Sequence, residues 1–296
     1  MASTSVLGFV GLGVMGEPMC RNLAAKSGAR VVAFDTRPAP LAALAAHGVE
    51  RAASAADVAV RADIVFVCLP GEAQVRAVCL GADGIVGRLD AGRTLVDMST
   101  VPVALARELG AAALARGVAF ADAPVARTAQ AAVDGTLSIM VGAEPALFER
   151  LRPYLAHMGS EITHCGPVGA GAAVKLMNNM VVAQTVVALA EALAVARASG
   201  AVDPEVLFRT LTKGSADSFA LRNHGMKSLL PDQHPTQGAF PTSYIIKDLS
   251  YAIALAESAG LDLAQAATTK RLMERTAEAG YRDHYYTAVI RTIQKS

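Results

Sequence analysis

One lysine and two asparagines stand together in a segment that carries no other charge. In "GAGAAVKLMNN" (169–179), Lys175 precedes Asn178 and Asn179 by three and four residues, so a helix would place all three side chains on one face. Lys175 is also the only lysine between Lys26 and Lys213. Its ammonium, with an ordinary pKa of ~10.4, can donate a proton to the alkoxide that forms when a carbonyl accepts a hydride. The alternative is a lysine that reaches water while the asparagines make a helix contact. The glycine-rich segment before the helix and the two adjacent asparagine side chains favour a catalytic role for Lys175.

A glycine-rich turn near the N-terminus suggests what would carry the hydride. The stretch "GFVGLGVMGEPMCRNL" places Gly11, Gly13 and Gly16 between a predicted strand and a predicted helix. Gly11 permits the tight turn, Gly13 lets the backbone approach a pyrophosphate, and Gly16 lets the helix lie close to the strand. A structural turn without a ligand is the alternative, and the surrounding strand and helix argue against it. The predicted dinucleotide contacts in this turn also include Leu12, Val14 and Met15.

An acidic residue follows at about the position that recognises the adenosine ribose. Asp35 ends the second predicted strand, near the spacing of roughly 20 residues typical of a ribose-binding carboxylate. A carboxylate there accepts bonds from the ribose hydroxyls and repels a 2′-phosphate, which predicts NAD. Thr36 and Arg37 are placed to receive that phosphate instead, so NADP is the alternative cofactor.

Composition excludes several classes of protein. The net charge of +1, without runs of lysine or arginine, gives no reason to expect nucleic acid or a membrane surface as a partner. Four scattered cysteines without a CxxC pair, and histidines without an HExxH pattern, predict a reduced cytoplasmic protein with no metal site. The N-terminus lacks the basic region of a signal peptide.

One apolar segment resembles a membrane span by composition. Residues 176–198 contain Asn178, Asn179, Gln184, Glu191 and Arg197, and the uninterrupted apolar stretches are too short to cross roughly 30 Å of hydrocarbon. A long helix buried between domains or subunits is therefore expected. The same apolar helix, together with a helical second half, predicts a homodimer or homotetramer.

The order of predicted elements indicates the fold. Strands are predicted at Val6–Val10, Val31–Phe34, Ile64–Leu69, Thr94–Met98, Ala119–Asp122 and Ser138–Val141. Alanine- and leucine-rich helical segments such as 15–27 and 103–115 separate them, which predicts a parallel, doubly wound sheet. After Pro167 the pattern is helical, first to about Ser199 and then near 204–213, 242–259, 262–279 and 284–294. We expect an α/β Rossmann-type domain at residues 1–166, then a long helix and an all-α domain at 167–296.

Seven motifs in order resemble the β-hydroxyacid dehydrogenase family along nearly the whole chain. This family includes 3-hydroxyisobutyrate dehydrogenases, tartronate semialdehyde reductases and sulfolactaldehyde reductases. The motifs are "GFVGLGVMGEPMCRNL", "CLP" (68–70), "DMSTVP" (97–102), "DAPV" (122–125), "GTLSIMVG" (135–142), "GAGAAVKLMNN" (169–179) and "KDLSYA" (247–252).

The resemblance implies a role for each matching residue. It makes Lys175 the proton donor and acceptor, and Asn179, with Asn178 beside it, the residue that orients the substrate. Further residues are implied to line the cofactor or the substrate. Ser99 and Thr100 would flank the nicotinamide, and Leu69 and Pro70 would run along the cofactor. Lys247, supported by Asp248, would approach the cofactor, and Phe240 would close the site. Without the resemblance, Lys247 and Asp248 would be taken for an ordinary surface pair.

The chain departs from the family in the substrate loop. Most members continue DAPV with Ser-Gly-Gly, whereas here Val125 is followed by Ala126, Arg127 and Thr128. With no acidic residue beside it in the sequence, Arg127 is expected to be unpaired and to bind the anionic group of the substrate. Thr128 would replace the lost serine hydroxyl. Sulfolactaldehyde reductases resemble this sequence in their Arg-Thr pair. The alternative is an outward-pointing Arg127 and an ordinary carboxylate site.

These features predict an NAD- or NADP-dependent oxidoreductase that acts on a small aldehyde or ketone and its hydroxy form. The substrate is expected to bear a sulfonate, a phosphonate or a carboxylate; the simple-carboxylate alternative is a 3-hydroxyisobutyrate dehydrogenase or a tartronate semialdehyde reductase. A related imine reductase and a cofactor-binding sensor without turnover are further alternatives. The presence of Lys175 argues against both.

Overall fold

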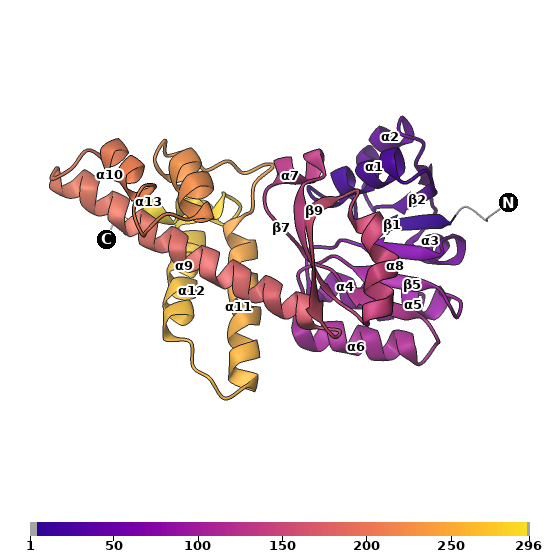
Figure 1. Ribbon diagram of the computed structural model, residues 1–296. Coiled ribbons are helices and arrows are strands. Elements are labelled where there is room, and N and C mark those ends of the chain that lie inside the picture. Colours follow the sequence, from indigo (N-terminus) through magenta and orange to yellow (C-terminus); the bar gives the residue numbers. More distant parts are fainter. Residues whose placement is uncertain (1–4, 295–296) are drawn as a thin grey trace. The chain divides into compact units, whose positions relative to one another are not determined.

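The chain forms two compact units that divide between Lys175 and Leu176, within one long helix. The computed structural model describes residues 5–294. The division falls inside the helix, whereas the sequence-based boundary lies after residue 166. Figure 1 shows the sheet-containing unit in indigo to magenta and the helical unit in salmon to yellow.

In the part of the chain that the structure describes, nine strands form one sheet in the order β3-β2-β1-β4-β5-β6-β8-β7, with β9 on the other side of β8. The strands are β1 (Val6–Val10), β2 (Arg30–Phe34), β3 (Glu50–Arg51), β4 (Ile64–Val67), β5 (Thr94–Asp97), β6 (Ala119–Asp122), β7 (Val125–Ala126), β8 (Leu137–Gly142) and β9 (Gly159–Gly166). The first six are parallel. Their order is that of a dinucleotide-binding Rossmann sheet.

Helices alternate with these strands and cover both faces of the sheet, since the central strands are buried throughout. They are α1 (Gly16–Lys26), α2 (Pro38–Ala45), α3 (Ala55–Arg61), α4 (Glu72–Leu80), α5 (Ile85–Arg88), α6 (Val103–Leu114), α7 (Ala129–Asp134) and α8 (Pro145–Leu155). Inside, Phe9 and Phe66 stack with ring centroids 6.2 Å apart. The predicted fold class is thereby confirmed for this half.

The sheet has more strands than the sequence pattern predicts, and not all of them are parallel. β3, β7 and β9 were not expected, and β8 runs antiparallel to β6 and β7. β9 has the sequence GSEITHCG and lies at the sheet edge, where most of its side chains are half-buried or exposed. Such a strand needs no continuous apolar run, so its sequence carries little of the usual strand signal.

The second half is helical, as predicted. It comprises α9 (Ala170–Ser199), which begins in the first unit, followed by α10 (Pro204–Leu211), the π-helix η1 (Leu221–Leu229), α11 (Thr242–Ser258), α12 (Ala264–Thr276), η2 (Ala277–Tyr281), η3 (Tyr286–Ala288) and α13 (Val289–Ile293). Phe208, Leu249 and Met273 are buried in its core. The π-helices η1 and η2 were not expected as such, because their hydrogen-bond spacing departs from the 3.6-residue period of the α-helix.

By length and apolarity alone α9 passes the test for a membrane span, although 44% of its most apolar stretch is buried within the protein. Core helices of soluble proteins pass the same test. Ala183, Val186, Ala190 and Leu193 of this helix belong to the core of the helical unit. The burial accords with a helix of the protein interior.

Candidate functional site

The glycine turn between β1 and α1 is shaped by close backbone packing. Gly11 has φ +93°, and a Cβ there would collide with the carbonyl oxygen of Cys68. A Cβ on Gly16 would collide with the carbonyl oxygen of Gly11, whereas one on Gly13 would meet no heavy atom within 4 Å. Two glycines are therefore required by the protein itself, and the third faces open space. Met15, the residue before α1, makes no side-chain cap, which suits a helix end that receives an anion.

Asp35, at the end of β2, is joined both to this turn and to Arg37. Its carboxylate accepts hydrogen bonds from Leu12 N at 2.7 Å and from Arg37 N at 2.8 Å. The Arg37 guanidinium adds a bond from Nε at 3.1 Å and donates through Nη2 to the Leu12 carbonyl oxygen at 2.9 Å. Burial by itself raises the pKa of Asp35, but the bonds from Arg37 and Leu12 outweigh it and the pKa is lowered. The group is a carboxylate at neutral pH, with a cation held against it.

The ends of β4 and β5 meet beside the glycine turn. Ser99 is buried, and its hydroxyl accepts a hydrogen bond from Leu69 N at 2.9 Å. Ser99 N donates to Asp97 Oδ1 at 2.9 Å. A Cβ on Gly11 would also lie 2.9 Å from the Leu69 side chain, so the structure brings Gly11, Leu69 and Ser99 together. Pro70 and Thr100 follow directly in the same two loops.

Asp97 was not among the predicted site residues. It is completely buried, which raises its pKa to about 6 against the opposing effect of the Ser99 bonds. Its Oδ2 atom has no hydrogen-bond partner among the described residues. The sequence offered one sign of it, an acidic residue at the end of a buried strand and two residues before Ser99.

The substrate loop differs from the sequence-based expectation at Arg127. Val125 and Ala126 form β7, and Arg127 then has φ +88°, a backbone conformation that favours glycine. This is where most family members carry a glycine. The guanidinium is not unpaired: it donates to the Thr136 carbonyl oxygen and, at 3.0 Å, to the Ser160 hydroxyl. Thr136 reaches Arg127 through the β7–β8 pairing, and Ser160 reaches it through the β8–β9 pairing.

Thr128 is engaged at the same place. Its hydroxyl caps α7 by accepting a bond from Ala131 N at 3.3 Å. A side-chain oxygen directly before a helix is a favoured cap, so the local sequence accounts for this contact. The hydroxyl has a structural role in addition to the predicted replacement of the family's serine.

The helical unit contains a buried polar network around Asp248. Asn179 Nδ2 donates to Asp248 Oδ2 at 2.6 Å, and Lys247 Nζ donates to Asp248 Oδ1 at 2.7 Å. Asn178 Nδ2 donates in turn to Asn179 Oδ1 at 3.0 Å. Asp248 is 1% exposed, so Lys247 and Asp248 are not an ordinary surface pair. Because Asp248 holds the amide of Asn179, the predicted substrate-orienting residue has a fixed rotamer.

Lys175 is 8% exposed and Asn179 is 7% exposed, one turn apart on α9. This burial contradicts the interpretation of Lys175 as a lysine that reaches water. In the helical unit, Phe240 packs edge-on against Tyr244 and Tyr286, with centroids 5.8 and 6.1 Å away.

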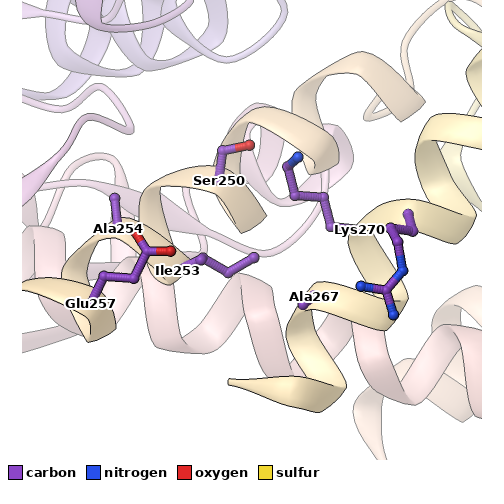
Figure 2. A pocket seen from close by; sticks show the side chains of 7 residues that line it. Ser250, Ile253, Ala254, Glu257, Ala267 and Lys270 are labelled. Atoms are coloured by element: carbon purple, nitrogen blue, oxygen red, sulfur yellow. The ribbon is translucent and has the colours of Figure 1, made fainter. Parts of the chain in front are cut away.

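A groove in the helical unit lies apart from the predicted site residues. A groove of about 360 Å³ separates α11 from α12 and is lined by Ser250, Ile253, Glu257, Lys270 and others (Figure 2). It contains none of the predicted site residues, and its open, shallow walls carry charges of both signs. Among residues 5–294 there is also no group of histidine, cysteine or acidic side chains suited to a metal.

Comparison with known proteins decides the family. The profile of the NAD binding domain of 6-phosphogluconate dehydrogenase matches residues 6–166. The NAD-binding profile of NADP-dependent 3-hydroxyisobutyrate dehydrogenase matches residues 169–293. The chain belongs to the β-hydroxyacid dehydrogenase family.

Named relatives within this family cover almost the full chain. It is 34% identical to the 2-(hydroxymethyl)glutarate dehydrogenase of Eubacterium barkeri over 98% of this chain and 95% of that one. It is 35% identical to the 3-hydroxyisobutyrate dehydrogenase of Pseudomonas aeruginosa over 92% of each. The structure of Mycobacterium tuberculosis 3-hydroxyisobutyrate dehydrogenase with L-serine superposes with a TM-score of 0.86 at 32% identity, over 99% of this chain and 100% of that chain.

This β-hydroxyacid dehydrogenase is therefore an oxidoreductase that acts on a hydroxy group, with NAD or NADP as its cofactor. The predicted fold class, family, enzyme class and cofactor are confirmed. The glycine turn and Asp35 fit the dinucleotide by geometry: one open glycine beside an uncapped helix start, and a carboxylate at the end of the second strand.

Proposed function

We propose that the protein interconverts a small anionic hydroxy acid and its carbonyl form, with Lys175 exchanging the proton on the substrate oxygen. The observation that carries this proposal is the burial of Lys175 one helical turn before Asn179, whose amide is held by Asp248. The dinucleotide, when bound, supplies or accepts the hydride. A buried ammonium is positioned far more narrowly than an exposed one, which suits proton transfer to a single oxygen atom.

The other residues bind and orient in this proposal. Asn179 hydrogen-bonds the substrate, while Asp248 and Lys247 keep its side chain in one orientation. Ser99 holds the Leu69 loop beside the glycine turn, where the nicotinamide half of the cofactor would lie.

Replacement of the amine tests the proton-transfer role. For Lys175→Met we expect kcat to fall by ~1,000-fold, within the range for loss of a general acid, while NADH affinity measured by its fluorescence stays unchanged. Lys270→Met is the matched control, because Lys270 pairs with Glu274 on α12 away from these residues. Wild-type turnover by Lys175→Met would contradict the proposal. If the wild type oxidised NADH with none of the short semialdehydes tested, a cofactor-binding sensor would be favoured instead. Turnover of cyclic imines would favour an imine reductase.

We further propose that NAD is the preferred cofactor. Asp35 presents a charged carboxylate where the adenosine ribose would lie, and this charge repels a 2′-phosphate. Arg37 opposes the preference, because its exposed guanidinium lies against the same carboxylate and can turn toward a phosphate.

Substitutions of Asp35 and of Arg37 should change the preference between NADH and NADPH in opposite directions. Asp35→Asn keeps an acceptor for Leu12 N and should reduce the ratio of kcat/KM for NADH over NADPH by at least ~10-fold, the scale of a bond to a charged group. Arg37→Ala should increase this ratio. A wild-type preference for NADPH would contradict the proposal.

A carboxylate is the leading substrate anion, since relatives are named for 3-hydroxyisobutyrate and 2-(hydroxymethyl)glutarate. A sulfonate or phosphonate is the second candidate, favoured by Arg127 in a loop where the family usually has glycine. The bonds to Thr136 and Ser160, with the Glu161 carboxylate 4.0 Å from the guanidinium, engage Arg127 within the protein and weigh against the second candidate.

Arg127→Gly tests whether the guanidinium binds the substrate anion, because glycine suits the positive φ and keeps the loop conformation. If the guanidinium binds the substrate anion, kcat/KM should fall by ~100-fold for the preferred substrate. The screen comprises 3-hydroxyisobutyrate, L-serine, 2-(hydroxymethyl)glutarate, sulfolactate and hydroxyphosphonates. Ser160→Ala, which removes one partner of Arg127 and no charge, is the control. Unchanged kcat/KM in Arg127→Gly would assign the arginine a structural role.

The protein is also proposed to be a cytoplasmic homodimer or homotetramer. Its four cysteines are free, which fits a reducing compartment. Val174, Val181 and Val195 of α9 are exposed at multiples of seven residues, so they lie along one face of the helix.

Substitution of exposed valines by glutamate tests whether this face of α9 forms the subunit interface. For Val181→Glu combined with Val195→Glu, light scattering should show a shift from an oligomer to the 30.5 kDa monomer, because two carboxylates would be desolvated in the interface. Val60→Glu changes an equally exposed valine on α3 and should leave the mass unaltered. A wild-type mass of 30.5 kDa would reject the proposal.

A further inference from the structure

Asp122 is a buried carboxylate with no assigned role in the chemistry. It is the last residue of β6, it is 1% exposed, and it pairs in register with Asp97 of β5. The segment that leads into the substrate loop begins at the next residue, Ala123, whose N–H donates to the Asp97 carbonyl oxygen at 2.7 Å. The side chain of Asp122 points to another part of the chain altogether, the start of α9.

Two backbone N–H groups at that helix start donate to the two oxygens of Asp122. Gly169 N lies 2.6 Å from Oδ1 and Ala172 N lies 2.7 Å from Oδ2. Gly169 precedes the helix and has φ +93°, and as a glycine it has no side chain with which to cap the helix itself. Asp122 therefore supplies from β6 the cap that is normally local, and its charge suits the positive end of the helix dipole.

The neighbouring glycines are adapted to this contact. A Cβ on Gly142, the last residue of β8, would collide with Asp122 Oδ1. A Cβ on Gly171 would lie 2.9 Å from Asp122 Oδ2 and would collide with the Met140 carbonyl oxygen. The carboxylate thus fits between Gly142 and Gly171 and the backbone N–H groups at the start of α9, so a displacement of this turn changes its hydrogen bonds.

We propose that Asp122 is a positioning residue for Lys175: by fixing the first turn of α9 against β6, it sets where the lysine stands relative to the substrate loop. Lys175 follows Ala172 by three residues, less than one helical turn, so a rotation or shift of the capped turn moves the lysine directly. The same strand end starts the loop that would hold the substrate. One carboxylate therefore couples substrate loop and proton donor, an inference that rests on the proposed function.

Asp122→Asn is the principal test, because it is isosteric and retains one acceptor. We expect kcat to fall by ~10-fold, and Asp122→Ala, which loses both acceptors, to lose ~100-fold, the scale of a misplaced catalytic group. KM for the dinucleotide and for the substrate should be unchanged. The solvent deuterium isotope effect on kcat should rise, because proton transfer becomes the slower step; a purely structural contact would not move this quantity.

Asp203→Asn is the matched control. Asp203 caps α10 by accepting from Glu205 N at 2.9 Å and Val206 N at 3.0 Å, and that helix carries no proposed site residue. It should lower thermal stability without changing kcat or the isotope effect. Gly171→Ala provides a second approach, since its methyl group displaces the capped turn while the carboxylate is kept, and it should reproduce the loss of kcat.

The outcomes separate this inference from the proposed function. Wild-type kcat and isotope effect in Asp122→Asn, with Lys175→Met inactive, would overturn the positioning role alone. An equal loss of kcat in Asp122→Asn and Asp203→Asn would also overturn it, because the effect would then be general destabilisation. Activity in Lys175→Met would overturn the proposed function on which it rests.

Discussion

The parallel alignment of the central strands is the constraint on which the dinucleotide-binding half depends. Because β1, β2, β4, β5 and β6 all run the same way, their carboxyl ends lie along one edge of the sheet. The loops that leave this edge carry the glycine turn, Asp35, Leu69, Ser99 and the substrate loop. Residues far apart in the sequence are thereby collected without any one loop being long.

Backbone N–H groups, more than side chains, connect these loops to one another. The Asp35 carboxylate accepts a hydrogen bond from Leu12 N, and the Ser99 hydroxyl accepts one from Leu69 N. The Asp122 carboxylate accepts one from Gly169 N. In each case a side-chain oxygen near a strand end accepts a bond from the backbone of a neighbouring segment. Buried backbone donors are costly to leave unsatisfied, so these bonds define loop positions and also complete the hydrogen bonding of the edge.

Burial of charge recurs in the helical unit and has a physical cost. Asp248 is taken out of water, and removing one partner of a buried ionic pair typically costs about 3–5 kcal/mol. Lys247 and Asn179 together satisfy both of its oxygens. The result is an amide held in one orientation, which a more exposed carboxylate would not achieve.

Local sequence determined the glycine turn, the position of Asp35 after the second strand, the six principal strands and the helical second half. It also determined that Lys175 stands one helical turn before two asparagines. These features follow from periodicity and short spacing, which act within a few residues of the chain. Tertiary structure alone decided the partners of Arg127, the cap that Asp122 supplies to α9, the buried state of Asp248 and the edge strand β9. Each of these depends on segments distant in sequence meeting in space, and the long-range contacts that bring them together leave no periodic pattern in either segment.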